Sequence, residues 1–303
     1  YRALITVPTG MVKTSTNPAP VTPASGSATG GNDFGLFTLG TISGTVYNDT
    51  NGNGVKATAE VGMAGRTVYL DANSNGVFDL GEQSATANSS GIYAFTGLVS
   101  GSYLPRLVSV TGSTQTSVNP IAIAVSSGTN FITGDFGVFL NATITGTVYS
   151  DSSANGRRDA GEIGLPNMTV YIDVNGNSIF DVSEPTAVTD ATGVYAFSTL
   201  GFGSFKVRPS LPQYTIQTST ALVAVSTTSG STSANNDVGL FVQGRIGGTV
   251  FDDLNYNGAR DVGEPGLVGA TVFLDTNNNN TQNTGEPTLT TDTTGAYEFT
   301  GLV

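Results

Sequence analysis

The sequence contains no cysteine, no histidine and no tryptophan in its 303 residues. Without cysteine and histidine, the chain has no disulfides, thiol nucleophiles, imidazole bases or zinc sites of the Cys/His kind. Basic residues are also few, since 11 Lys and Arg stand against 23 Asp and Glu and the formal net charge is −12. Nucleic-acid binding and attraction to anionic membrane surfaces both depend on Lys and Arg, so neither partner is expected.

Long hydrophobic runs and helical periodicity are missing as well. No segment is long enough to span a membrane as an apolar helix, so membrane insertion is not expected. Glycine, in contrast, is abundant with 40 residues, and Thr, Ser, Val and Asn are frequent. This composition is typical of an all-β protein with many turns.

The sequence repeats itself at a fixed interval. Segments of the form I-x-G-T-V-[YF]-x-D begin at Ile42, Ile144 and Ile246, so the spacing is 102 residues in both cases (144 − 42 and 246 − 144). A second motif, G-x-Y-x-F, recurs 49 residues further on in each copy (91 − 42, 193 − 144 and 295 − 246). Self-similarity of this kind indicates a tandem array.

Within each copy, short segments alternate apolar and polar residues, as strands with one buried face do. Ile42, Gly44 and Val46 share one face of such a segment, and Tyr93 and Phe95 share a face of another. About seven such strands per period, separated by Gly, Asn and Ser turns, favour an immunoglobulin-like sandwich. A unit of about 100 residues buries a core of its own, so the predicted fold class is all-β, with tandem immunoglobulin-like β-sandwich domains.

The period divides the chain into four parts. Residues 42–143 and 144–245 are complete β-sandwich repeats, residues 1–41 match the C-terminal strands of a split unit, and residues 246–303 match the N-terminal half of one. Neither half-unit covers its own sheet edge. Two explanations stay open. Either further repeats of the same chain supply the missing parts, or the N-terminal strands of one copy complete the C-terminal half of the next, which would give a head-to-tail homopolymer.

Each unit also contains two loops with the twelve-position calcium pattern D-x-[DN]-x-[DN]-G-x5-E. They are the first loop (49–60, 151–162 and 253–264) and the second loop (71–82, 173–184 and 275–286). The expected ligands in the first loops are Asp49, Asn51, Asn53 and Glu60; Asp151, Ser153, Asn155, Asp159 and Glu162; and Asp253, Asn255, Asn257, Asp261 and Glu264. Those in the second loops are Asp71, Asn73, Asn75, Asp79 and Glu82; Asp173, Asn175, Asn177, Asp181 and Glu184; and Asp275, Asn277, Asn279, Asn283 and Glu286.

The spacing has a chemical reason. Calcium takes six to eight hard oxygen ligands, and alternate residues of a tight loop direct their oxygens inward. Glycine at the sixth position makes the sharp turn, the seventh residue offers its backbone carbonyl, and the final Glu closes the shell with both carboxylate oxygens. The sequence therefore predicts EF-hand-like loops with calcium as the cofactor.

Some positions depart from the pattern. Ala57 replaces the ninth-position Asp of one loop, Ser153 is a weaker third-position ligand, and Ser178 and Asn280 stand where Gly is expected. Many ligands are neutral Asn, which predicts a weak affinity of roughly 10⁻⁴ to 10⁻³ M, typical of extracellular modules. The alternative, that these clusters are only Asx turns between strands, is disfavoured by six copies in register that all end in Glu.

The motifs resemble a known family. The opening segment, the two Asp- and Asn-rich loops and the G-x-Y-x-F motif are together similar to the SdrD B-like repeat of bacterial surface adhesins, a relative of the Cna B-type domains. The resemblance covers the whole chain and implies an immunoglobulin-like sandwich, several calcium ions per unit and a stalk that stiffens when calcium binds. No Lys lies in the opening strands at Ile42, Ile144 or Ile246, so the resemblance does not extend to the Lys–Asn isopeptide cross-link of the Cna B relatives.

The predicted function is a non-enzymatic structural subunit or stalk of an extracellular filament or cell-surface protein, rigidified by calcium. Two alternatives remain, an adhesin repeat region that binds a host or matrix ligand and a spacer in a secreted polysaccharide-active enzyme. Surface glycans are a further expected partner at N-x-[ST] sequons such as those that begin at Asn88, Asn141, Asn167 and Asn279. Three acids recur before the last strand of each unit and are expected to be turn residues rather than calcium ligands, namely Asp33, Asp135 and Asp237.

Overall fold

The computed structural model describes residues 1–132, 134–220 and 224–303, which form strands, turns and loops without any helix. Within these residues there is accordingly no helix long and apolar enough to cross a membrane. The chain consists of two compact units. One contains Tyr1–Ile144, Phe197–Ser204 and Ser226–Ser233, and the other contains Thr145–Ala196, Phe205–Val225 and Ala234–Val303.

The strands follow the period of the sequence. Ahead of the first repeat come β1 (Met11–Lys13) and β2 (Leu36–Thr38). The first repeat contains β3 (Gly40–Asn48), β4 (Thr67–Leu70), β5 (Ser84–Thr86), β6 (Ile92–Leu98), β7 (Gly101–Tyr103), β8 (Pro105–Leu107), β9 (Ser113–Gln115), β10 (Ile123–Val125), β11 (Asn130–Ile132) and β12 (Phe136–Leu140).

The second and third repeats continue in the same order. The second contains β13 (Ala142–Ser150), β14 (Thr169–Ile172), β15 (Thr186–Val188), β16 (Val194–Leu200), β17 (Ser204–Phe205), β18 (Val207–Pro209), β19 (Thr215–Gln217), β20 (Val225–Ser226), β21 (Thr232–Ser233) and β22 (Val238–Val242). The third contains β23 (Gly244–Thr249), β24 (Thr271–Phe273), β25 (Thr288–Thr290) and β26 (Ala296–Leu302).

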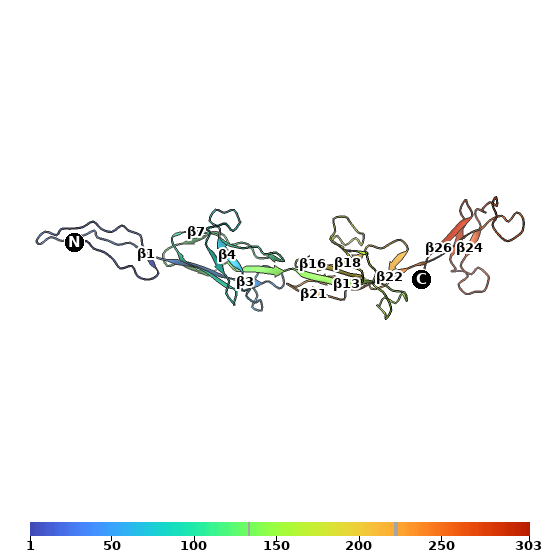
Figure 1. The fold of residues 1–303 in the computed structure, drawn as a ribbon, viewed down its shortest axis with the longest axis horizontal. Helices are drawn as coiled ribbons and strands as arrows, with labels where there is room; N and C mark the ends of the chain where they lie inside the picture. The colour runs from blue at the N-terminus through green and yellow to red at the C-terminus, as the bar shows by residue number, and fades with distance from the viewer. Residues whose placement is uncertain (133, 221–223) are drawn as a thin grey trace. The chain divides into compact units, whose positions relative to one another are not determined.

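In the first repeat, whose strands β3, β4 and β7 are labelled in Figure 1, β3 pairs with three other strands. It pairs β6 antiparallel and β11 and β12 in parallel, and β9 pairs β12. A second sheet has the order β5-β4-β8, and β10 pairs β7. Alternate side chains of β3 point inward, so Ile42 and Val46 join Val68 of β4, Tyr93 of β6 and Phe136 of β12 in one core. The period-two pattern of the sequence thus produces a two-sheet sandwich.

The second repeat reproduces this topology. β13 pairs β16, β21 and β22 as β3 pairs β6, β11 and β12, and Val148 lies opposite Val238 just as Val46 lies opposite Phe136. The predicted all-β array of immunoglobulin-like sandwiches is confirmed. Each complete repeat has ten strands among its described residues where about seven were expected, and many of them are only two or three residues long.

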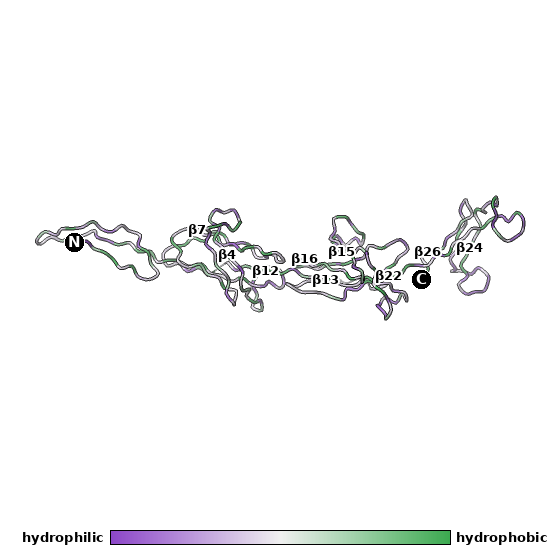
Figure 2. Tube along the Cα trace, in the orientation of Figure 1, coloured by the Kyte–Doolittle hydropathy of each residue, from purple (hydrophilic) through white to green (hydrophobic). Residues whose placement is uncertain are grey.

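The third repeat and the N-terminal segment hold fewer strands. β23 pairs β26, and β24 pairs β25. Ile246 of β23 is 50 % exposed, whereas its counterparts Ile42 and Ile144 are fully buried. β1 and β2 pair Met11 with Thr38 in the register in which β9 and β12 pair Ser113 with Leu140. Figure 2 shows hydrophobic stretches within strands such as β12 and β22 and mostly hydrophilic loops around β24.

Candidate cation-binding loops

In the complete repeats each predicted loop begins directly after a strand, and in the third repeat it begins a few residues after one. The first loops follow β3, β13 and β23, and the second loops connect β4 to β5, β14 to β15 and β24 to β25. The opening carboxylate is buried in the complete repeats, with an exposure of 0 % for Asp49 and Asp151 and 4 % for Asp71 and Asp173. The preceding strand belongs to the core, and it therefore carries this residue to the base of the loop.

All six loops share a backbone with two left-handed residues. At the sixth position φ is 74° for Gly54 and Gly76, and Ser178 and Asn280 adopt φ of 64° and 58°. The predicted sharp turn is thus present even where Gly is replaced. The fourth position is also left-handed, at Gly52, Ser74, Ala154, Gly176, Tyr256 and Asn278. The sequence did not indicate this second turn, because its residues share no chemical property.

Two carboxylates close each loop by accepting backbone amides. Asp49 accepts the N–H groups of Asn53 and Gly54 at 3.2 and 2.7 Å. Glu60 accepts those of Thr50 and Ala57, both at 2.9 Å. The bond from position six to the Asp and the two bonds to the Glu recur in all six loops. The carboxylates at positions one and twelve are therefore both held by backbone amides of the same loop.

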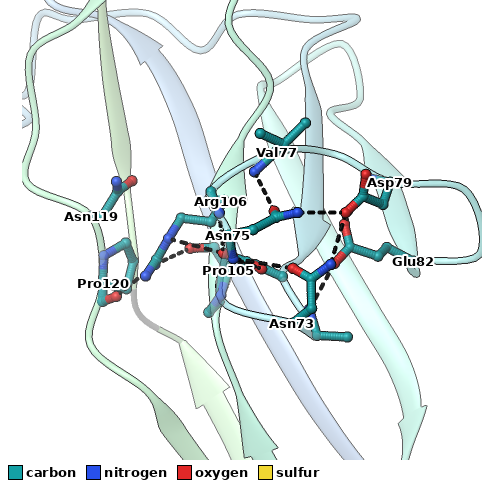
Figure 3. A network of polar contacts seen from close by, with 12 residues as sticks. Asn73, Asn75, Val77, Asp79, Glu82, Pro105, Arg106, Asn119 and Pro120 are labelled. Carbon is teal, nitrogen blue, oxygen red and sulfur yellow. Dashed lines mark hydrogen bonds and ion pairs between the residues drawn. The ribbon is translucent and has the colours of Figure 1, made fainter.

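The third, fifth and ninth positions converge on one another. In the second loop of repeat one, the side-chain amides of Asn73 and Asn75 donate to Asp79 Oδ2 at 2.8 and 2.7 Å (Figure 3). The corresponding bonds in the first loop of repeat three run from Asn255 and Asn257 to Asp261, and both loops of repeat two have such bonds to Asp159 and Asp181. In the loop where Ala57 takes the ninth position, no carboxylate is available to accept them.

Two arginines next to the second loops were not anticipated. Arg208 Nε lies 2.7 Å from Asp173 Oδ2, and Arg106 Nε lies 4.0 Å from Asp71 Oδ2. Arg106 also donates to the carbonyls of Pro105 and Pro120 (Figure 3). The two arginines occupy the same position in the first and second repeats, because they are 102 residues apart (208 − 106). This recurrence was the sequence signal that could have identified them as partners of the loops.

The electrostatics keep loop carboxylates ionised. Burial favours the neutral acid at Asp49, but the adjacent Thr116 hydroxyl and the amides of Gly54 and Asn53 outweigh it and lower the pKa. The side-chain amides of Asn73 and Asn75 lower the pKa of Asp79. Burial, reinforced by the charge of Asp49, raises the pKa of Tyr47 to about 12.

In the two complete repeats the sixth position of the first loop is packed closely. A Cβ added at Gly54 would lie 2.8 Å from the carbonyl oxygen of Thr116, and one added at Gly156 would lie 2.8 Å from that of Thr218, whereas nothing lies within 4 Å of one added at Gly76. This difference is consistent with Ser178 in the second loop of repeat two; in the third repeat nothing lies within 4 Å of a Cβ added at Gly258 either. The hydroxyl of Thr116 is buried beside the loop and makes no hydrogen bond of good geometry with any described residue.

The donor set matches what calcium prefers, since carboxylate, amide and backbone oxygens are all hard ligands. In the described part of the chain, no three Asp, Glu, His or Cys side chains gather closely enough to hold a metal by themselves. An ion would therefore also need the Asn oxygens, which accept backbone amides, as Asn75 Oδ1 does from Val77 at 2.7 Å. The ligand assignment stays a prediction.

Asp135 and Asp237, which recur outside the loops, accept hydrogen bonds from the opening strands. Asp135 Oδ1 accepts the N–H of Thr45 at 2.8 Å, and Asp237 Oδ1 accepts that of Thr147 at 2.7 Å. These bonds tie the segment before β12 or β22 to the opening strand of the same repeat, in keeping with a structural role.

The comparisons with known proteins agree with the repeat pattern. The family model of the SdrD B-like domain matches residues 40–133, 142–240 and 244–303. Serine-aspartate repeat-containing protein D of Staphylococcus aureus (strain Newman) is 28 % identical over 282 residues, which cover 85 % of this chain and 20 % of that protein. Serine-aspartate repeat-containing protein F of Staphylococcus epidermidis is 29 % identical over 284 residues, which cover 85 % of this chain and 16 % of that protein. The chain thus spans about one fifth of these relatives or less.

Similar solved structures include the Bacillus anthracis TIE protein, with a TM-score of 0.30 and 16 % identity, covering 88 % of this chain and 46 % of that one. A streptococcal ancillary pilin has a TM-score of 0.32 and 11 % identity, covering 66 % of this chain and 62 % of that one. The three segments matched by the family model include most of the sequence. The chain belongs to the SdrD B-like domain family.

Proposed function

We propose that this chain is a calcium-rigidified stalk region of an extracellular, cell-surface protein. Membership of a family found in bacterial surface adhesins supports the location, and tandem sandwiches suit a spacer that carries load. The observation that carries the proposal is the common geometry of the six loops. In each of them an Asp and a Glu flank a group of amide and hydroxyl or carboxylate oxygens.

Calcium suits these loops better than magnesium. Magnesium demands a strict octahedron and retains its waters, whereas calcium accepts the larger and more flexible oxygen shell that a twelve-residue loop offers. Sixteen of the 23 acidic residues lie in the six loops, and a divalent cation would relieve their mutual repulsion. An ion bridging positions one and twelve would also fix the loop at the end of a core strand, which supports a stiffening role.

We infer a non-enzymatic role for the same residues. The chain lacks Cys and His, and the loop carboxylates recur with the domain instead of forming one unique constellation. Paired acids of a glycosidase would need such a constellation with a defined separation around a substrate.

The substitution Glu264→Ala tests the ion sites in the intact chain. Glu264 is 7 % exposed and at position twelve would supply two ligand oxygens, so the variant is expected to lose the calcium-induced rise in Tm of the third repeat in calorimetry. Glu298→Ala is the matched control, because it removes an exposed carboxylate of the same repeat outside the loops. A calcium response of Glu264→Ala equal to that of the control would refute the site assignment.

One observation favours an adhesive function as a second candidate. The first repeat has an apolar hollow of about 460 Å³ lined by Ile121, Ile123 and Phe131, among others, and the second repeat has Ser233 at the position of Phe131. An exposed apolar patch is a feature of interaction surfaces. Binding to immobilised extracellular-matrix proteins should then be weaker for Phe131→Ser than for the parent chain, and equal binding would exclude this role for the hollow.

We also propose a partner for the third repeat. In the second repeat, β13 pairs β21 and β22 besides β16, but β23 pairs only β26 among the described residues. Equivalent strands would come from further repeats of the same chain or from residues 1–41 of a second copy, which carry β1 and β2. Light scattering on the full chain and on residues 42–303 distinguishes these sources. Assembly lost on the deletion identifies a second copy, whereas monomers in both samples identify further repeats.

A further inference from the structure

Two pieces of the second repeat belong to the same compact unit as the whole first repeat. They are Phe197–Ser204 and Ser226–Ser233. The sequence period places both of them well inside the second repeat, which begins near residue 144. Their contacts with the first repeat converge on its first loop and on the end of β12.

Phe202 makes the apolar part of this contact. Its ring lies 6.2 Å from the ring of Phe139 in an edge-to-face arrangement, with an interplanar angle of 72°. Its Cβ and Cγ also cover Gly52, the fourth residue of the first loop. A Cβ added at Gly52 would lie only 2.4 Å from Phe202 Cβ and 2.5 Å from Cγ. The ring therefore occupies the space that a side chain at this loop position would fill.

Backbone conformation alone does not require glycine at this position. The fourth residue is left-handed in every loop, yet Ser74, Ala154, Tyr256 and Asn278 adopt that conformation with φ between 54° and 62°. Gly176 holds the same position in a second loop, where an added Cβ would meet only Lys206 Nζ at 3.8 Å, so glycine also occurs there without a covering ring. At Gly52, in contrast, the side chain of Phe202 leaves no room for a Cβ.

A serine–glycine turn makes the polar part of the contact. Ser229 Oγ accepts the N–H of Leu140 at 2.7 Å and donates to Asn48 Oδ1 at 2.5 Å. The N–H of Gly230 donates to the carbonyl of Leu140 at 2.9 Å, and that of Ser229 donates to the carbonyl of Thr50 at 3.3 Å. The turn thereby joins the last strand of the first repeat to both residues that flank Asp49.

The same turn recurs one period earlier. Ser127 Oγ accepts the N–H of Thr38 at 2.9 Å, and the N–H of Gly128 donates to the carbonyl of Thr38 at 2.9 Å. Thr38 is the counterpart of Leu140 (140 − 38 = 102). The same bonds thus recur after one period of 102 residues. We infer that they are a regular feature of the contact between one repeat and the next.

We propose that Gly52, Phe202 and the Ser229–Gly230 turn form a repeat-to-repeat latch that holds the second repeat on the first loop of the first repeat and makes this joint specific for its two neighbours. Ala154 and Tyr256 carry side chains where the ring would lie, so the other first loops do not accept a repeat with Phe at this position in the same way. The coupling of the latch to an ion rests on the proposed function. Asn48, Thr50 and Gly52 alternate with the expected ligands Asp49 and Asn51, and an ion held by those ligands would fix the surface on which the latch closes.

Spin-label distances in the full chain test the latch. Because the chain has no cysteine, labels at Ser84→Cys and Thr186→Cys, two exposed and equivalent positions of the first and second repeats, are unique. The parent is expected to give a narrow distance distribution in calcium, and Phe202→Ala and Ser229→Ala are expected to broaden it. Ser127→Ala is the matched control at the neighbouring joint and should leave the distribution narrow. A parent as broad as the variants, or variants as narrow as the parent, overturns the proposal.

Hydrogen exchange adds a readout for the individual bonds. Ser229→Ala should remove protection from the amide of Leu140 while Thr38 keeps its own, and Ser127→Ala should do the reverse. Unchanged protection of Leu140 in Ser229→Ala would contradict the assignment of the turn.

Specificity is tested by a double-mutant cycle. Gly52→Ala alone should broaden the distribution, because the new Cβ meets the ring, whereas Ala154→Gly should leave it unchanged. In a chain that already carries Phe202→Gly, the additional Gly52→Ala should have no further effect. Additive broadening would show that Gly52 is not matched to Phe202.

A calcium chelator separates the two proposals. If the loops bind calcium, chelation broadens the distribution of the parent towards that of Phe202→Ala. If they do not, chelation has no effect on the parent, and the proposed function fails while the broadening caused by Phe202→Ala still supports the latch.

Discussion

Asn88, Asp190 and Asp292 occupy the same turn in the three repeats, and one side-chain oxygen of each accepts two backbone amides. Asp190 Oδ1, for example, accepts the N–H groups of Thr192 and Val194 at 2.8 and 2.9 Å. The amide of Val194 and the hydroxyl and amide of Thr192 lower the pKa of Asp190. The first repeat makes the equivalent bonds with Asn88, which does not titrate.

This difference predicts a pH dependence that the first repeat lacks at this turn. The folded pKa of Asp190 lies below its ordinary value of 3.8, so its contribution to stability is fully present above that value and is lost as the pH falls through the folded pKa. Asp190→Asn should flatten the acid-induced loss of stability of the second repeat, measured by urea unfolding between neutral and acidic pH. A parent and a variant that lose stability in parallel would contradict this role of Asp190.

Two loop glycines are expected to differ in how much their substitution destabilises the protein. Gly54 and Gly76 are both left-handed, and Ala in that conformation costs about 1–2 kcal/mol. Only at Gly54 would the new Cβ also meet a carbonyl oxygen, that of Thr116. Gly54→Ala should therefore lower the free energy of unfolding by more than Gly76→Ala in denaturant titrations. Equal losses would mean that the first loop moves away from Thr116 without cost.

At the scale of single strands, the position of the opening strand in its sheet decides how much its side chains contribute. Ile144 on β13 is fully buried, whereas Ile246 on β23 is half exposed because β23 pairs only β26 among the described residues. Truncation of a buried Ile to Ala removes its contacts and leaves a cavity.

Ile144→Ala is accordingly expected to destabilise the second repeat by about 2–5 kcal/mol. Ile246→Ala, the same substitution at the equivalent position, should cost clearly less in this chain. Calorimetry of the two variants provides the measurement. A loss for Ile246→Ala as large as that for Ile144→Ala would indicate that β23 is covered by additional strands in solution.

At the scale of the whole molecule, calcium is expected to act through mass action. Each ion that binds the folded loop and not the unfolded chain adds about 2.7 kcal/mol at a concentration of 100 Kd. Thermal unfolding over a series of calcium concentrations should therefore give a Tm that rises with the logarithm of free calcium. Magnesium at equal concentration is the control and should have a much smaller effect. A Tm independent of calcium would remove the ion from the proposed function.

The local pattern was sufficient for much of the fold and the candidate site. Strand alternation predicted the face that carries Ile42 and Val46 into the core, and the loop spacing predicted the sharp turn at the sixth position, where Gly54 is left-handed. Both features depend on residues that are close in sequence, so their geometry follows from local conformation. The partners of Asp71 and Asp173 were not predicted, because Arg106 and Arg208 reach them from a different strand of the sheet.

The sequence by itself determined the period, the all-β class, the family and the position of the six loops, because each of these is written in short segments that recur every 102 residues. Only the tertiary structure placed the side chain of Phe202 against Gly52. The two residues are 150 positions apart (202 − 52). Their contact forms between distant segments of one compact unit, and neither residue type recurs one period away, where Ser100 and Ala154 stand.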